Sequence, residues 1–139
     1  MVNLITGKNG KGKSKFLLEK VNTQVKEILG NVVYLDTSTK HMYELNNKIR
    51  LINISEYNIS SGDMIIGFLL GILSGDHDIQ QMYFDNFLSL SHTSMDELEN
   101  IVSKLEDLST TFGIDIFMAV STTDAPIPES LKDKVLEAL

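Results

Sequence analysis

An eight-residue segment rich in glycine and lysine, Gly7–Ser14, limits the possible folds of this chain more than any other feature. It fits the pattern G-x-x-x-x-G-K-[ST], in which a loop between a strand and a helix wraps around phosphate groups. The flanking residues suit that setting, because 2–6 form a short apolar run and 13–29 carry apolar residues at helical spacing. The segment therefore predicts a strand, a phosphate-binding loop and a helix that stops at Gly30; the alternative is a turn that binds nothing.

The composition of this loop predicts how it would hold a nucleoside triphosphate. Its three glycines allow positive φ angles and a close approach of backbone N–H groups to the ligand, and the start of the next helix adds further donors. The Lys13 ammonium would reach the β- and γ-phosphates, and the Ser14 hydroxyl would bind Mg²⁺. The predicted nucleotide-binding residues are Gly7, Lys8, Asn9, Gly10, Lys11, Gly12, Lys13 and Ser14.

A carboxylate is expected near Ser14, because Mg²⁺ keeps several waters and is bound through few protein ligands. Asp85 ends the apolar strand predicted at 81–85 and is the candidate for this role, so that Ser14 and Asp85 form the predicted metal site. The alternative is an aspartate that caps a helix or belongs to a loop. The next residue, Asn86, is a neutral amide, which orients a water molecule but is a poor general base.

Asp36 ends the strand predicted at 31–36 and joins Asp85 as a candidate catalytic acid. A turn or cap residue is the alternative for Asp36, and Glu44 is a looser candidate for the same catalytic role. The hydroxyl residues after the last predicted strand are candidate sensors of the γ-phosphate: Ser121 and Thr122. The histidines share no metal-ligand spacing and are interpreted as loop or surface residues without a role: His41, His77 and His92.

Strands and helices alternate along the chain, which predicts one domain over residues 1–139 with an α/β fold and a mostly parallel sheet covered on both faces. The five expected strands are 2–6, 31–36, 49–54, 81–85 and 114–120. The expected helices are 13–29, 64–73, 95–112 and a closing helix that Pro126 and Pro128 open and that runs to Leu139. Polar residues 37–47 hold one short helix at most.

Two features of this layout bear on packing and on the site. Residues 64–73 are apolar on all sides, so we expect a buried helix in which Gly67 and Gly71 allow close approach to the sheet or, alternatively, a dimer contact. Ligands of parallel sheets bind at the carboxyl ends of the strands. We therefore expect the glycine-rich loop, Asp36 and Asp85 to converge on one site.

Charge is distributed unevenly along the chain, whose net charge is −7. Residues 1–50 carry nine basic and four acidic residues (+5), whereas 51–139 carry three basic and fifteen acidic residues (−12). The acidic second half argues against broad nucleic-acid binding, and the positive excess surrounds the loop that would bind a polyanion. The chain has no cysteine, which excludes disulfides and thiolate metal sites. The longest apolar run, 64–73, is too short to span a bilayer, so a cytoplasmic protein without a membrane contact is expected.

From Val2 to about Val120 the chain resembles P-loop NTPases, through the loop 7–14 and the acid-ended strands. The recombinase-like branch places its catalytic acid where Asp36 stands, at the end of the strand after the first helix. The resemblance implies a three-layer P-loop NTPase fold with a five-stranded sheet. As a whole, the chain resembles small stand-alone P-loop proteins of unknown role that sometimes carry the label of a twitching-motility ATPase.

The loop also resembles the deviant Walker motif of partition and septum-site ATPases, in which a lysine at the second position reaches the nucleotide of a dimer partner. Lys8 stands at that position, although Asn9 replaces the usual glycine, and the alternative for Lys8 is an exposed surface lysine. A Lys8 that reaches the nucleotide of a partner implies a homodimer.

These observations together predict a protein that binds Mg²⁺ and ATP and acts as a slow or partner-activated NTPase. The alternatives are a module that binds nucleotide without hydrolysis and a nucleoside or small-molecule kinase. Kinases surround their transition state with several positive groups, and this chain has a single arginine, Arg50. Adenine is favoured over guanine because the Asn-Lys-x-Asp guanine signature is missing: Asn47-Lys48 is followed two residues on by Arg50.

Overall fold

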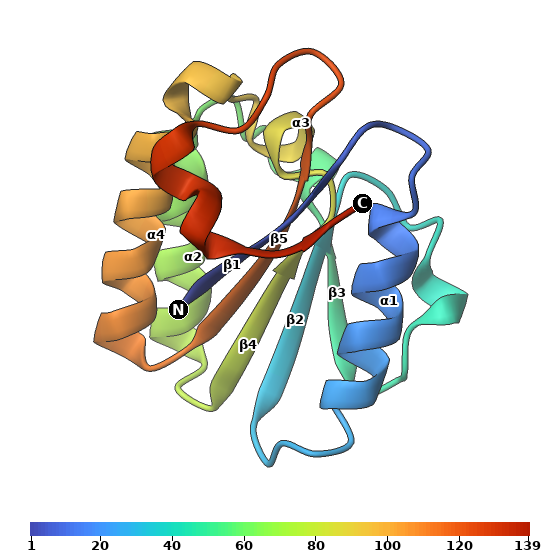
Figure 1. The fold of residues 1–139 in the computed structure, drawn as a ribbon. Coiled ribbons are helices and arrows are strands. Elements are labelled where there is room, and N and C mark those ends of the chain that lie inside the picture. Colours follow the sequence, from blue (N-terminus) through green and yellow to red (C-terminus); the bar gives the residue numbers. More distant parts are fainter.

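The computed structural model describes residues 1–139 as a six-stranded sheet with helices on both faces (Figure 1). The strand order is β3-β2-β4-β5-β1-β6, and every pairing is parallel. The strands are β1 (Val2–Gly7), β2 (Asn31–Asp36), β3 (Ile49–Asn53), β4 (Ile79–Phe84), β5 (Asp115–Ser121) and β6 (Val135–Ala138). The prediction of a mostly parallel α/β fold is confirmed.

Helices connect the strands and cover the sheet unequally. The α-helices are α1 (Lys13–Gln24), α2 (Gly62–Gly75), α3 (Phe87–Ser91) and α4 (Leu98–Phe112). The 3-10 helices are η1 (Met42–Glu44), η2 (Ile54–Glu56), η3 (Met95–Glu97) and η4 (Glu129–Lys134). Helix α1 lies on one face of the sheet, and α2 and α4 lie side by side on the other (Figure 1). None of these helices has the length and hydropathy that crossing a membrane requires.

Burial on both faces explains why the central strands were recognisable from sequence. Val32–Leu35 in β2 are all buried, and successive side chains point to opposite faces. Val32 and Tyr34 join a cluster of 11 buried residues beneath α1. Val33 and Leu35 join a larger cluster of 25 buried residues beneath α2 and α4. A strand with no polar face must lie in the middle of a covered sheet.

The end of the chain corrects two predictions, because it forms a sixth strand instead of a closing helix. After η4, residues 135–138 form β6, which pairs with β1. The Leu139 N–H donates to the Thr6 carbonyl at 2.8 Å. Backbone groups on this side of β1 need partners, and the distant segment satisfies them. The local helical propensity of 129–139 is thus overridden by a non-local ladder, and the sheet has six strands rather than five.

The first helix is shorter than predicted. It ends at Gln24, and a turn carries the chain to β2 with Leu29 fully exposed at 102% of its reference area. Gly30 is not a left-handed helix stop: a Cβ there would lie 2.3 Å from the Asp78 carbonyl oxygen. Close approach of the α2–β4 turn, and not helix termination, therefore requires glycine at this position.

Helix α2 is not buried on all sides as predicted. Its buried face consists of Gly62, Ile65, Leu69 and Leu73. Gly67 and Gly71 are exposed, and nothing lies within 4 Å of a Cβ built at either glycine. The predicted close packing of these glycines on the sheet is wrong.

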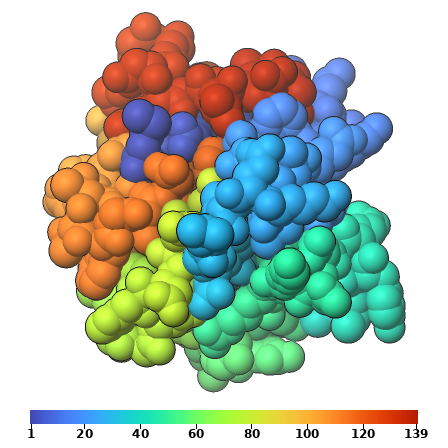
Figure 2. All heavy atoms as spheres, turned by 90° about the horizontal axis from the view of Figure 1, so that it is seen from below, coloured from blue at the N-terminus to red at the C-terminus, as the bar shows by residue number.

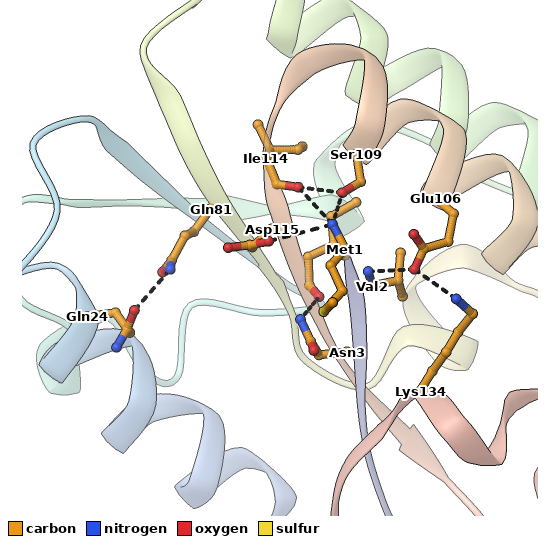
Figure 3. Close-up of polar contacts among 11 residues, drawn as sticks. Met1, Val2, Asn3, Gln24, Gln81, Glu106, Ser109, Ile114, Asp115 and Lys134 are labelled. Atoms are coloured by element: carbon orange, nitrogen blue, oxygen red, sulfur yellow. Dashed lines mark hydrogen bonds and ion pairs between the residues drawn. The ribbon is translucent and has the colours of Figure 1, made fainter.

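Polar contacts close the end of the sheet at which the strands begin. Glu106 of α4 accepts from the Val2 N–H at 2.7 Å and from the Lys134 ammonium at 3.0 Å (Figure 3). Partial burial of Glu106 acts to raise its pKa, but the Lys134 and Val2 donors outweigh it, and the pKa is lowered. The Met1 ammonium contacts Ser109 and lies 3.5 Å from Asp115. Viewed from this end, the first residues lie against atoms of the α4–β5 region (Figure 2).

Candidate functional site

The glycine-rich segment forms an open loop from the end of β1 to the start of α1. Gly10 and Gly12 have φ angles of 83° and 96°, which residues with a Cβ rarely adopt. Nothing lies within 4 Å of a Cβ built at either position, so backbone conformation and not space requires glycine here. The Gly12 carbonyl accepts the first helical hydrogen bond, from the Phe16 N–H at 3.0 Å. Two of the three glycines in the segment Gly7–Ser14 are therefore required by the backbone of the loop.

The end of β5 holds this loop in place. The Thr123 hydroxyl accepts from the Asn9 N–H at 2.8 Å, and the Ser121 hydroxyl donates to the Asn9 side-chain carbonyl at 2.8 Å. The Thr122 N–H donates to the Gly7 carbonyl at 3.0 Å. The Ser121 hydroxyl, predicted to sense a γ-phosphate, is therefore engaged with the loop in this structure.

The Lys13 side chain folds back over the loop. Its ammonium donates to the Lys8 carbonyl at 3.0 Å, while the side chains of Lys8 and Lys11 are exposed. Burial lowers the pKa of Lys13, and the negative charge of Asp85 partly opposes that change. The ammonium thus has one hydrogen-bond partner, the Lys8 carbonyl.

Asp85 accepts two hydroxyl hydrogen bonds, one on each oxygen. Ser14 donates to Oδ1 at 2.8 Å and Tyr34 donates to Oδ2 at 3.0 Å. The Asp85 N–H donates to the Leu35 carbonyl at 2.9 Å, which fixes the carboxylate at the carboxyl edge between β2 and β4. Burial is the main cause that raises the pKa of Tyr34, and the negative charge of Asp85 is the second. The Tyr34 hydroxyl therefore stays protonated and acts as a donor. Tyr34 was not predicted as a site residue.

Asp36 and His41 complete this cluster. Asp36 is 2% exposed; its Oδ1 accepts from the Thr37 N–H at 2.7 Å, whereas its buried Oδ2 has no partner. His41 Nε2 is also buried without a hydrogen-bond partner and lies 3.8 Å from Asp85 Oδ2. One ligand atom from each of Asp36, His41 and Asp85 lies within 4.8 Å of the others. His41 is a loop residue, as predicted, but it is half-buried and its ring lies beside Asp85.

A polar cavity of about 400 Å³ lies at the carboxyl edge of the sheet and is lined by both aspartates and the glycine-rich loop. It has no hydrophobic lining residue and is formed by Asn9, Gly10, Gly12, Lys13, Ser14, Asp36, Thr37, Lys40, Asp85 and Asn86. The loop, Asp36 and Asp85 converge here. The cavity lining does not include Lys8, Lys11, Glu44 or Arg50. Glu44 lies beside His41, whose Nδ1 is 3.2 Å from Glu44 Oε2. His77 is exposed elsewhere, and His92 lines a neighbouring cavity.

Compared with models of protein families and with curated proteins, the chain gives no match.

Replacing Asp36 with asparagine is expected to stabilise the protein without ligand by about 1 kcal/mol at pH 7. Burial, and then the charge of Asp85, raise the pKa of Asp36. A raised pKa means that folding disfavours the carboxylate, and this penalty grows as the pH rises from the ordinary pKa through the folded value. Asparagine keeps the acceptor for Thr37 and removes the charge.

Denaturant unfolding at pH 7 and at pH 4 tests this prediction. The advantage of Asp36→Asn should be largest at pH 7 and should shrink towards pH 4. A variant that is less stable than the parent at pH 7 would show that Asp36 contributes to stability as a carboxylate.

Proposed function

We propose that this protein binds Mg²⁺ and ATP through the loop 7–14 and is a slow or partner-activated NTPase. The observation that carries the proposal is the convergence of Lys13, Ser14 and Asp85 on one wholly polar cavity. The proposal includes a three-layer P-loop NTPase fold of the recombinase-like branch, which the parallel sheet with helices on both faces supports. A cytoplasmic location is part of the same proposal.

The residues at the Ser14–Asp85 contact fit Mg²⁺. A hydroxyl and a carboxylate oxygen lie 2.8 Å apart, and both are hard oxygen ligands of the kind that Mg²⁺ prefers. Bound there, Mg²⁺ would supply positive charge to the terminal phosphates. Ser14 and Asp85 would hold the metal, Lys13 would exchange the Lys8 carbonyl for a phosphate oxygen, and the loop N–H groups would bind the remaining oxygens.

The residues around the cavity favour slow hydrolysis. Asn86 offers an amide and no base, and Asp36, which lines the cavity, has a buried carboxylate oxygen, Oδ2, without a donor. Arg50 is exposed on β3 outside the cavity, so this chain places no arginine beside the phosphates. An arginine supplied in trans is worth roughly 10³–10⁵ in rate in NTPases of this mechanism. A protein partner or a second copy would supply that charge; Lys8 in trans from a homodimer stays a prediction.

Intrinsic ATP turnover is expected at about 10⁻⁴–10⁻³ s⁻¹, the range of NTPases that lack an arginine in the site. Steady-state phosphate release from the purified protein measures it, with Lys13→Ala as the control for contaminating ATPase. Turnover above about 1 s⁻¹ that Asp36→Asn abolishes would instead establish a self-sufficient ATPase. Nucleotide binding with phosphate release equal to that of Lys13→Ala would favour the non-hydrolysing module.

A further inference from the structure

We propose that Asp36, His41 and Asp85 form a second cation site, selective for a divalent transition metal such as Zn²⁺. The three residues come from separate segments: Asp36 ends β2, His41 precedes η1, and Asp85 follows β4. Their ligand atoms lie within 4.8 Å of one another. This inference concerns the protein without nucleotide, so it does not depend on the proposed ATPase function.

Two orphaned atoms mark the centre of the cluster. Asp36 Oδ2 and His41 Nε2 are buried and have no hydrogen-bond partner. Buried polar atoms in folded proteins are nearly always paired, so an unpaired acceptor beside an unpaired ring nitrogen needs an explanation. A metal ion bound between them would satisfy both atoms at once.

The negative charges of Asp36 and Asp85 also favour a bound cation. Asp36 and Asp85 are 2% and 4% exposed, and neither forms an ion pair with a lysine or arginine within 4.0 Å. Two buried carboxylates this close together, with no lysine or arginine paired directly to either, are costly, because each opposes the ionisation of the other. A divalent cation would balance both charges.

The donor set identifies the class of metal. One imidazole nitrogen with two carboxylate oxygens suits Zn²⁺ and related transition metals, whereas Mg²⁺ takes oxygen ligands. His41 is also oriented as a ligand: its Nδ1 lies 3.2 Å from Glu44 Oε2, which leaves Nε2 facing the two aspartates. A carboxylate on the second ring nitrogen fixes the tautomer and strengthens the imidazole as a ligand.

Asp85 lies between this site and the proposed Mg²⁺ site and contributes one oxygen to each. Its Oδ1 faces the Ser14 hydroxyl, whereas its Oδ2 lies near His41 and accepts from Tyr34. The carboxylate can therefore bridge two cations, one on each oxygen. Because Asp36 and Asp85 also line the phosphate cavity, the second cation would lie at its wall.

Titration of the nucleotide-free protein with Co²⁺, followed by visible absorption and then by displacement with Zn²⁺, tests the proposal. We expect one equivalent of Co²⁺ to bind, one equivalent of Zn²⁺ to displace it, and His41→Ala to weaken binding by at least about 100-fold. Glu44→Gln should weaken it by about 10-fold, because Glu44 acts only through the ring of His41. His77→Ala is the matched control, since His77 is exposed and outside the cluster.

The outcomes separate this proposal from the one above. Lys13→Ala should lose nucleotide affinity and keep Co²⁺ affinity, because Lys13 is not among the three ligands. Asp36→Asn serves as a second ligand variant and should also lose Co²⁺; the thermal midpoints of both ligand variants establish that they are folded. Equal Co²⁺ affinity in the parent and His41→Ala, or no Co²⁺ binding by the parent, would overturn the site.

Discussion

Replacing Lys13 with alanine is expected to weaken the binding of Mg²⁺–ATP by about 100-fold. A hydrogen bond to a charged group contributes roughly 1.5–3 kcal/mol, and each 1.4 kcal/mol is a factor of ten in affinity. The fold should survive, because the Lys13 ammonium contacts only the Lys8 carbonyl of an exposed loop. Displacement of a fluorescent ATP analogue measures the change in affinity.

Lys11→Ala is the matched control for this change. Lys11 lies in the same loop and carries the same charge, but it is exposed and does not line the cavity. Its removal should change affinity by less than about threefold, as expected for a solvent-screened charge. Equal losses in the two variants would mean that the loop attracts nucleotide only through its overall charge.

Replacing Asp85 with alanine is expected to remove the Mg²⁺ dependence of ATP binding. In the parent, Mg²⁺ should raise ATP affinity by at least about tenfold, which corresponds to about 1.4 kcal/mol of binding free energy. The variant should bind ATP equally with and without the metal. The reason is that Lys13 and the loop N–H groups bind phosphate directly, while Asp85 would act through the metal. Titration of ATP at zero and at saturating Mg²⁺ measures the dependence.

A second variant separates metal binding from stability at this position. Alanine leaves the buried Tyr34 hydroxyl without its acceptor, which costs about 1–3 kcal/mol of stability. Asp85→Asn keeps an acceptor oxygen and removes the charge, so it should lose the Mg²⁺ dependence at a smaller cost in stability. A parent-like response to Mg²⁺ in both variants would show that Asp85 is not a ligand of the metal.

The sheet was predictable where local sequence and tertiary packing agree. Residues 32–35 of β2 and 82–84 of β4 are apolar and buried on both faces, so these segments were recognisable, although β4 begins at Ile79, two residues before its predicted start. Helix α4 was predictable from the sequence, in which Ser94 and Glu97 have the spacing of the capping box that they form before the helix. In contrast, β6 depends on hydrogen bonds to β1, more than a hundred residues away, and the sequence of 129–139 by itself favours a helix.

Some residues of the candidate site were likewise predictable from local sequence, and others were not. Lys13, Ser14, Asp36 and Asp85 were predictable, because a motif or the end of an apolar strand marks each position. His41 was missed because the polar segment 37–47 has no periodicity, and only its path in space brings the ring to Asp85. Tyr34 was missed because it lies on β2 and its hydroxyl contacts Asp85 at the end of the neighbouring strand β4. Which strands are neighbours in the sheet cannot be predicted from local sequence. A loop that follows a candidate acid at a strand end is the place to look for such residues.

Backbone-amide NMR of the ¹⁵N-labelled protein, titrated with Mg²⁺ and a non-hydrolysable ATP analogue, tests the central claim most directly. The account predicts saturable binding at one site per chain, with the largest shifts in Gly7–Ser14 and smaller ones at Asp36 and Asp85. Amides at the opposite end of the sheet, such as Asp115, should not move. No shifts at millimolar nucleotide, or the largest shifts outside the loop, would contradict the assignment of this cavity as a nucleotide site.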